Sequence, residues 1–293
     1  MTTVATPATG VLRLPNLAAW LGVAPFFLFA VMFLILPTGS LLVGAFQDHD
    51  GAFTLSNLGR LWQPSIRLSY LLSIEISLAS AFLGALIGLA LAIAALRGGL
   101  PGWVRPTLMT FSGVASNFAG VPLAFAFMAT LGRLGFVTIL LRGVGVDLYA
   151  SGFSLFTFTG LTLTYLYFQI PLMVLVIAPA IDGLKTEWSE AADILGAGRL
   201  QYWRMIVLPI LWPSVLGASL LLFANAFGAI ATAYALTGSF LNIVPILLYA
   251  QIRGDVLHDP NLGYALAFGM MLITGLSNVA YLYLRARSDR WLK

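Results

Sequence analysis

The residues of this chain whose types and spacing most suggest a function lie in a short polar stretch, 190–209, between two long apolar segments. The stretch contains one carboxylate, several small residues and a proline, and it lacks a nucleophile paired with a base. Such residues suit a non-covalent contact with another protein rather than covalent chemistry. The positions that define the pattern are Glu190, Ala191, Ala192, Gly196, Ile206, Leu208 and Pro209.

The first half of this stretch is predicted to form a helix of about three turns. Thr186 is predicted as its N-cap, Glu187 lies in the first turn where the helix dipole favours an anion, and Gly196 supplies the stop. Residues 200–208 are predicted as a second amphipathic stretch along the membrane interface, before a new helix opens at Pro209. Four residues of the first helix recur at helical spacing and share one low apolar face: Trp188, Ala191, Ala192 and Leu195.

No pattern typical of a catalytic or metal site is present elsewhere. The chain has no cysteine and only two histidines, His49 and His258, which cannot alone build a typical zinc site. It also lacks the glycine-rich phosphate loop of ATPases and the signatures of zinc proteases and serine hydrolases. We therefore expect a non-enzyme without a metal or cofactor of its own.

The composition places the chain in a membrane. Of its 293 residues, 60% are apolar and only 9% are charged, and the mean hydropathy is +0.94. A formal charge of +4 is compatible with nucleic-acid binding, but the basic residues are scattered rather than clustered, so nucleic acid is not an expected partner. The surrounding medium is predicted to be mostly lipid.

Six apolar segments are long enough to cross a bilayer as helices, which takes about 20 residues. The first is too long for the core of a signal peptide, so it is expected to remain as an anchor. We predict an all-α integral membrane protein with one permease domain at 17–284, a cytosolic arm at 1–16 and a cytosolic tail at 285–293. The predicted spans are 17–36, 70–96, 106–131, 158–181, 211–236 and 263–284.

Orientation follows from the positions of lysine and arginine, which favour the cytosolic side. With both termini in the cytosol, ten of the fifteen basic residues lie inside, and the polar connection 182–208 faces the cytosol. The outer connection 237–261 contains an uncharged stretch, 240–251, which is predicted to be a short helix or a re-entrant element.

Polar residues within the spans indicate a route for a solute, because such side chains normally face the bundle interior or a wet cavity. The alternative is that these side chains only form hydrogen bonds that join one helix to another. Glu75 is the single ionisable residue well inside a span. It either contacts a cationic substrate or, because it lies near the outer end, pairs with Arg67 or reaches water. The remaining pathway candidates are Asn117, Tyr165, Gln169, Asn225 and Thr232.

The polar stretch resembles the "EAA" loop of permease subunits in binding-protein-dependent type I ABC importers. The similarity extends to the segments FQIPLMVLVIAPAID before the loop and LPILWPSVLGASLLLFANAFGAIATAYALTG after it, and to LALAIAALR at the end of the second span. The resemblance implies a bacterial inner-membrane permease that works with a second permease subunit, two ATPase subunits and a periplasmic or lipid-anchored solute-binding protein. It also implies that the ATPase subunits bind ATP and Mg²⁺, and that Glu190, Ala191, Ala192 and Gly196 contact them.

The segments FTLSNLGRLW and AFGAIATAYALTGSFLNIVPILLYAQI are most similar to the spermidine/putrescine branch, which predicts a polyamine-type solute. That branch also includes importers of ferric iron, sulfate, phosphonates and opines. An ATPase-independent secondary transporter is the alternative from another class, and the absence of a charged relay in the spans disfavours it.

Overall fold

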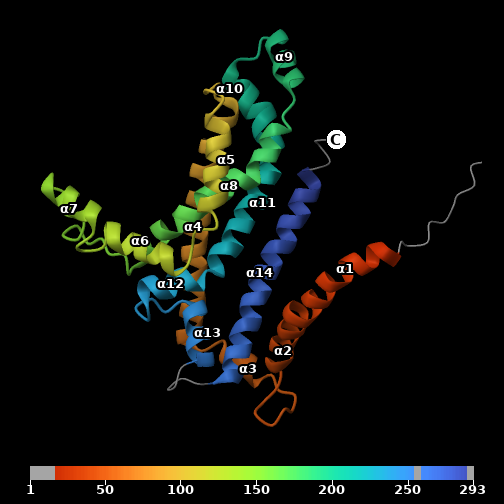
Figure 1. Cartoon of the computed structure of the whole chain (residues 1–293), viewed down its shortest axis with the longest axis vertical. Coiled ribbons are helices and arrows are strands. Elements are labelled where there is room, and N and C mark those ends of the chain that lie inside the picture. Colours follow the sequence, from red (N-terminus) through yellow and green to blue (C-terminus); the bar gives the residue numbers. More distant parts are fainter. Residues whose placement is uncertain (1–16, 254–258, 289–293) are drawn as a thin grey trace, which may run out of the picture.

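The computed structural model describes residues 17–253 and 259–288 and is nearly all helical in those ranges, which confirms the predicted all-α class. The predicted arm 1–16 and the end of the predicted tail lie outside the described residues. Figure 1 shows a bundle from which α1 leads away at one side and α7 at the other. The elements are α1 (Leu17–Ala30), η1 (Val31–Ile35), α2 (Leu36–Gly44), α3 (Ser56–Arg60), α4 (Pro64–Arg97), α5 (Val104–Ala115), α6 (Val121–Leu131), α7 (Phe136–Gly143), α8 (Phe158–Asp182), α9 (Thr186–Ile194), α10 (Arg199–Tyr202), η2 (Trp203–Val207), α11 (Leu208–Phe227), α12 (Ile230–Thr237), α13 (Val244–Arg253) and α14 (Pro260–Ser288).

Six helical stretches in the described part of the chain are long and apolar enough to cross a membrane, as the sequence predicts. The stretch formed by α8 is the most buried of them, whereas the first is exposed along its whole apolar window. The stretches are Trp20–Gly44, Pro64–Arg97, Val121–Gly143, Phe158–Asp182, Arg199–Phe227 and Pro260–Ala286.

The core of the bundle is the packing of α4 against α8 and α11, with α14 on the far side of α11. Glycines on α4 allow this approach. A Cβ on Gly84 would lie 2.7 Å from Cβ of Gln169, and one on Gly88 would lie 2.6 Å from Cβ of Met173. Small residues that let helix backbones approach closely are the usual basis of packing between membrane helices.

The third predicted span, 106–131, is wrong as a continuous helix. It breaks at 116–120 into α5 and α6, and the apolar stretch continues from α6 into α7. Gly120 has φ of +76°, a conformation that glycine adopts without strain, and Pro122 then opens α6. Hydropathy is insensitive to such a break, because the residues around it are as apolar as those of a continuous span.

The fifth predicted span, 211–236, is also interrupted, at Gly228 and Ala229 between α11 and α12. Its start differs as well, because 200–208 is not a separate interfacial stretch. It forms α10 and η2, which continue directly into α11. Pro209 is accommodated by a π-helical turn in which the Leu208 amide donates to the Trp203 carbonyl, so the missing proline donor does not end the helix.

The connections that the sequence predicts to lie outside contain the short helices α3, α7 and α13. α13 begins within the predicted uncharged stretch 240–251 and ends at Arg253, so it confirms a short helix there, packed against α14 and α4. α3 and α13 lie at one end of the bundle and α9 at the other (Figure 1). α14 continues as far as Ser288, beyond the predicted end of the span at residue 284.

Candidate functional site

α9 projects from one end of the bundle on the connection between α8 and α10 (Figure 1). Its first residue is Thr186, so the predicted N-cap is displaced by one position; Lys185 precedes the helix, which has no side-chain cap. Gly196 ends the helix with φ of +73°. The amide of Ala197 donates to the Ala192 carbonyl at 2.9 Å, and that of Gly196 donates to Asp193 at 3.0 Å. These are the two bonds of a Schellman motif, which accounts for a glycine at this position.

The predicted single apolar face of α9 is divided in the structure. Ala192 is buried and Trp188 packs against the chain's own main core, so this side attaches the helix to the bundle. Ala191 and Glu190 are exposed, and Leu195 is 85% exposed. Ile194 and Leu200, which the sequence reasoning missed, are 86% and 81% exposed and extend the same outward surface. Both are apolar residues close to the glycine stop, and this position could have identified them from the sequence.

Two arginines from other spans hold the segment that carries α9. Arg97, the last residue of α4, donates to the carbonyls of Ile181 and Leu184, which close α8 and lead into α9. Arg105 on α5 forms a 2.7 Å ion pair with Asp182. A cation at a helix C-terminus satisfies open carbonyls and interacts favourably with the helix dipole. The sequence reasoning had interpreted both arginines as topology signals only.

A second feature is a hollow of about 270 Å³ where the two broken spans meet. Residues from both breaks form its wall, so we call it the break hollow. The amide of Gly120 donates to Oγ1 of Thr232 at 2.7 Å and joins the two breaks. Tyr165 on α8 donates its hydroxyl to the Ala229 carbonyl at 2.8 Å. Irregular backbone at membrane depth needs such partners or a wet cavity. The wall consists of Ser116, Ala119, Gly120, Phe168, Asn225, Gly228, Ala229, Ile230, Ala231 and Thr232.

The structure brings some of the predicted pathway residues together. Asn225 and Thr232 line the break hollow. Tyr165 is buried behind it. Gln169, also buried, donates to the Leu222 carbonyl at 2.9 Å while its Oε1 has no hydrogen-bond partner among the described residues. Asn117 lies in the first break, where its amide donates to the Gly113 carbonyl at 2.9 Å, and it is not part of the wall.

Glu75 lies apart from these residues. It is exposed on α4, on a stripe that includes Leu71, Leu78 and Phe82, and it is absent from the wall of the break hollow. The predicted pairing with Arg67 is not found: the guanidinium of Arg67 lies over the Trp62 ring instead. This position gives Glu75 no contact with a solute in the hollow.

The described residues that form the wall of the break hollow are uncharged. They include no Asp, Glu, Lys, Arg or His, and their polar groups are hydroxyls, an amide and backbone groups. Within the described ranges, no group of three His, Asp or Glu residues could hold a metal ion. Weak polar groups of this kind suit the passage of a solute better than tight binding or catalysis.

The fold and these two features define a membrane-spanning transport protein. Residues 84–293 match the family described as "Binding-protein-dependent transport system inner membrane component", and the chain belongs to this family. It is therefore a permease subunit of an ABC importer, a multi-pass inner-membrane transport component.

Several curated proteins resemble the chain at low identity. The molybdenum transport permease ModB of Mycobacterium tuberculosis is 27% identical over 73% of this chain and 77% of its own length. The sulfate permease CysW of Synechococcus elongatus is 26% identical over 90% of this chain and 88% of its own length. The spermidine/putrescine permease PotB of Escherichia coli is 24% identical over 86% of this chain and 92% of its own length. The polyamine branch is therefore not singled out.

A solved structure confirms the fold. The crystal structure of a bacterial ABC transporter that imports the acidic polysaccharide alginate has a TM-score of 0.70 over 94% of this chain and 96% of the matched chain, at 17% identity. A second structure shows that transporter in complex with its alginate pentasaccharide-bound periplasmic protein.

Proposed function

We propose that α9 is the coupling helix through which a partner ATPase drives this permease. The observation that carries the proposal is the exposure of Glu190, Ala191 and Ile194 on α9, a helix held to the bundle by its other side, and of Leu195 and Leu200 on the segment that follows it. Apolar side chains exposed at the polar end of a membrane bundle indicate a protein contact. Both termini and α9 then face the cytosol, where ATP is present.

Because one side of α9 is held to the bundle, movement of α9 is transmitted to the membrane spans. Arg97 and Arg105 tie the start of the connection to α4 and α5, while its far end continues without interruption into α11. A displacement of α9 by a closing ATPase therefore reaches α8 and α11 together. The break hollow lies on this route, since α11 ends at it. We infer that Asn225 and Thr232 contact the solute there and that Tyr165 and Gln169 position the backbone.

The proposed partners are a second permease subunit, two ATPase subunits that bind ATP and Mg²⁺, and a solute-binding protein. The family membership and the alginate importer with its periplasmic protein support this assembly. The same family membership disfavours the alternative of an ATPase-independent secondary transporter.

A polyamine-type solute stays a prediction from the sequence, and it rests on the resemblance to the spermidine/putrescine branch. One observation favours a second candidate, a small tetrahedral oxyanion. A polyamine would be expected to meet carboxylates, whereas the wall of the break hollow has none and Glu75 lies elsewhere. The ModB and CysW relatives carry names of such oxyanion systems.

The experiment is purification of the complete importer followed by reconstitution in proteoliposomes. An ATPase subunit is expected to co-purify, and uptake is expected to require ATP and the binding protein. Calorimetry of the binding protein with spermidine, sulfate and molybdate then identifies the solute class. Uptake by this chain without an ATPase subunit would overturn the proposal.

A further inference from the structure

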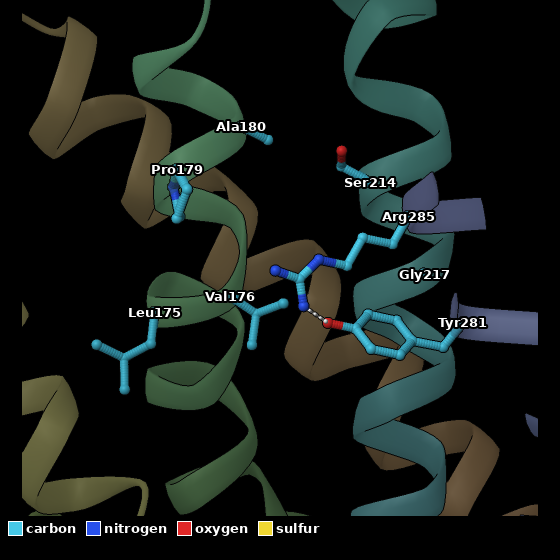
Figure 2. A pocket seen from close by; sticks show the side chains of 8 residues that line it. All are labelled: Leu175, Val176, Pro179, Ala180, Ser214, Gly217, Tyr281 and Arg285. Carbon is cyan, nitrogen blue, oxygen red and sulfur yellow. Dashed lines mark hydrogen bonds between the residues drawn. The ribbon is translucent and has the colours of Figure 1, made fainter. Parts of the chain in front are cut away.

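A second hollow, of about 310 Å³, lies between α8, α11 and α14 at the end of the bundle where α14 terminates. Figure 2 shows the side chain of Arg285 extending from α14 into the space between α8 and α11. We call this space the Arg285 hollow. Its wall includes Pro179 and Ala180 on α8 and Ser214 and Gly217 on α11.

Among the residues that the structure describes, the guanidinium of Arg285 has one hydrogen-bond partner. Its Nη1 donates to the hydroxyl of Tyr281, one turn earlier, at 3.3 Å. In the part of the chain that the structure describes, no carboxylate forms an ion pair with it; Asp182, at the end of α8, is held by Arg105. A guanidinium has five donors, and the described residues use only a small part of this hydrogen-bonding capacity.

The direction of the side chain is unusual for an arginine at a span end. Arg285 is the penultimate residue of the apolar stretch Pro260–Ala286, and such residues normally extend outward to water. Here the side chain points back between helices, toward the apolar residues Val176 and Pro179 (Figure 2). Arg285 is nevertheless exposed, so its guanidinium is accessible to a ligand.

The remaining groups favour a tetrahedral anion. The planar guanidinium fork matches two phosphate oxygens, and the Tyr281 hydroxyl beside it can donate a further bond. Gly217 permits this arrangement, because a Cβ there would lie 3.2 Å from Cδ2 of Tyr281. None of the described residues that form the wall is acidic, so none of them would repel an anion.

We propose that the Arg285 hollow binds a phosphate-type oxyanion, with Arg285 as the main ligand and Tyr281 as a second donor. Two sources carry this chemistry at a membrane interface: the headgroup of an anionic phospholipid and free inorganic phosphate. Basic pockets between membrane helices are established places for anionic headgroups.

The test uses the full chain in its importer complex, placed in nanodiscs of phosphatidylcholine with or without phosphatidylglycerol. Native mass spectrometry measures retained phosphatidylglycerol, and calorimetry in pure phosphatidylcholine discs measures inorganic phosphate. Arg285→Gln is expected to weaken binding about tenfold or more, as loss of a charged hydrogen-bonded contact does. Arg285→Lys retains the charge without the fork and is expected to give an intermediate loss.

Arg204→Gln is the matched control, since it removes an exposed arginine of η2 that is not part of the hollow. If Arg285→Gln fails to insert into the membrane, Tyr281→Phe provides a second test. This variant is expected to weaken binding a few-fold. Loss of phosphatidylglycerol in Arg285→Gln but not in Arg204→Gln supports a headgroup; loss of phosphate affinity alone supports free phosphate. Wild-type binding by Arg285→Gln in both arms, or equal losses in the two arginine variants, overturns the proposal.

Discussion

The two functional regions proposed for this permease, α9 and the break hollow, are built in opposite ways. α9 presents an exposed surface on a regular helix that is capped at its C-terminus by a Schellman motif. The break hollow is an inward space that exists because two spans interrupt their helices, and its backbone is held by side chains from other elements. Recognition of a partner protein requires a rigid outward shape, whereas passage of a solute requires a wall that is polar yet uncharged and able to rearrange. Substitutions should therefore affect coupling at α9 and solute movement at the hollow.

The largest effect is expected at the glycine stop of α9. Gly196→Asp forces a side chain onto a residue with φ of +73° and places a carboxylate beside the exposed surface, so uptake should fall at least a hundredfold while membrane insertion is retained. Gly99→Asp is the control, because Gly99 also has a positive φ of +68° and open space for a Cβ. The measurement is ATP-dependent uptake by reconstituted complexes. Equal losses in both variants would show that strain alone is responsible.

A smaller loss is expected at Arg97. Arg97→Gln removes the cation that holds the carbonyls of Ile181 and Leu184, a loss of about 1.5–3 kcal/mol for hydrogen bonds to a charged group. Uptake should fall about tenfold, with ATP hydrolysis no longer stimulated by the binding protein. Arg97→Lys should recover part of this coupling. Wild-type stimulation in Arg97→Gln would contradict a positioning role.

Loss of the hydrogen bond between the two breaks should lower both stability and uptake, because Thr232 holds the backbone of the break hollow and is also proposed to contact the solute there. Thr232→Val leaves the amide of Gly120 without its acceptor, which costs about 1–3 kcal/mol when the group is buried. Thr232→Ser retains the oxygen and should behave like the wild type. The comparison is thermal unfolding of the purified complex together with uptake. If valine and serine variants are equally stable, this hydrogen bond does not support the hollow.

The weakest structural effect concerns the ion pair between Arg60 on α3 and Asp259 before α14, at 2.6 Å. Burial raises the pKa of Asp259, but the hydrogen bonds from Arg60 and the Leu262 amide, together with the charges of Arg60 and His49, outweigh it, so the folded-state pKa is lower than the ordinary 3.8. The stabilisation is present above the unfolded pKa and is lost as pH falls through the folded value. The stability difference between wild type and Asp259→Asn should be constant from pH 8 to about 5, stay below about 1 kcal/mol, and shrink below about 3.8. If the stability difference instead grew as the pH fell, the predicted lowering of the Asp259 pKa on folding would be contradicted.

No effect is expected at Glu75. Because this carboxylate is exposed on α4 and is not part of the break hollow, Glu75→Gln should change uptake less than twofold and should leave solute preference unaltered. Initial uptake rates with competing solutes provide the measurement. A change in preference between cationic and anionic solutes would return Glu75 to the pathway.

The sequence was sufficient for the class of fold, because six long apolar segments leave few alternatives to a helical membrane bundle. It also located α9, since the helical spacing of Trp188, Ala192 and Leu195 and the stop at Gly196 are local signals. The breaks at 116–120 and 228–229 were missed because they depend on backbone conformation and on partners distant in sequence, such as Thr232 and Tyr165. For the same reason, the position of Asn117 on the third span and the ionisable side chain of Glu75 within the second could not show that neither residue lines the break hollow.

The central claim, that α9 is the contact with the ATPase, can be tested directly by cross-linking. The chain has no cysteine, so Leu195→Cys introduces a single thiol at a side chain that is 85% exposed. In the assembled importer, this thiol should form a cross-link to the ATPase subunit, and nucleotide should change its yield. Phe240→Cys is the control: Phe240 is 83% exposed and lies between α12 and α13, away from α9 (Figure 1). Cross-linking to the ATPase only from residue 240, or from neither position, would contradict the account.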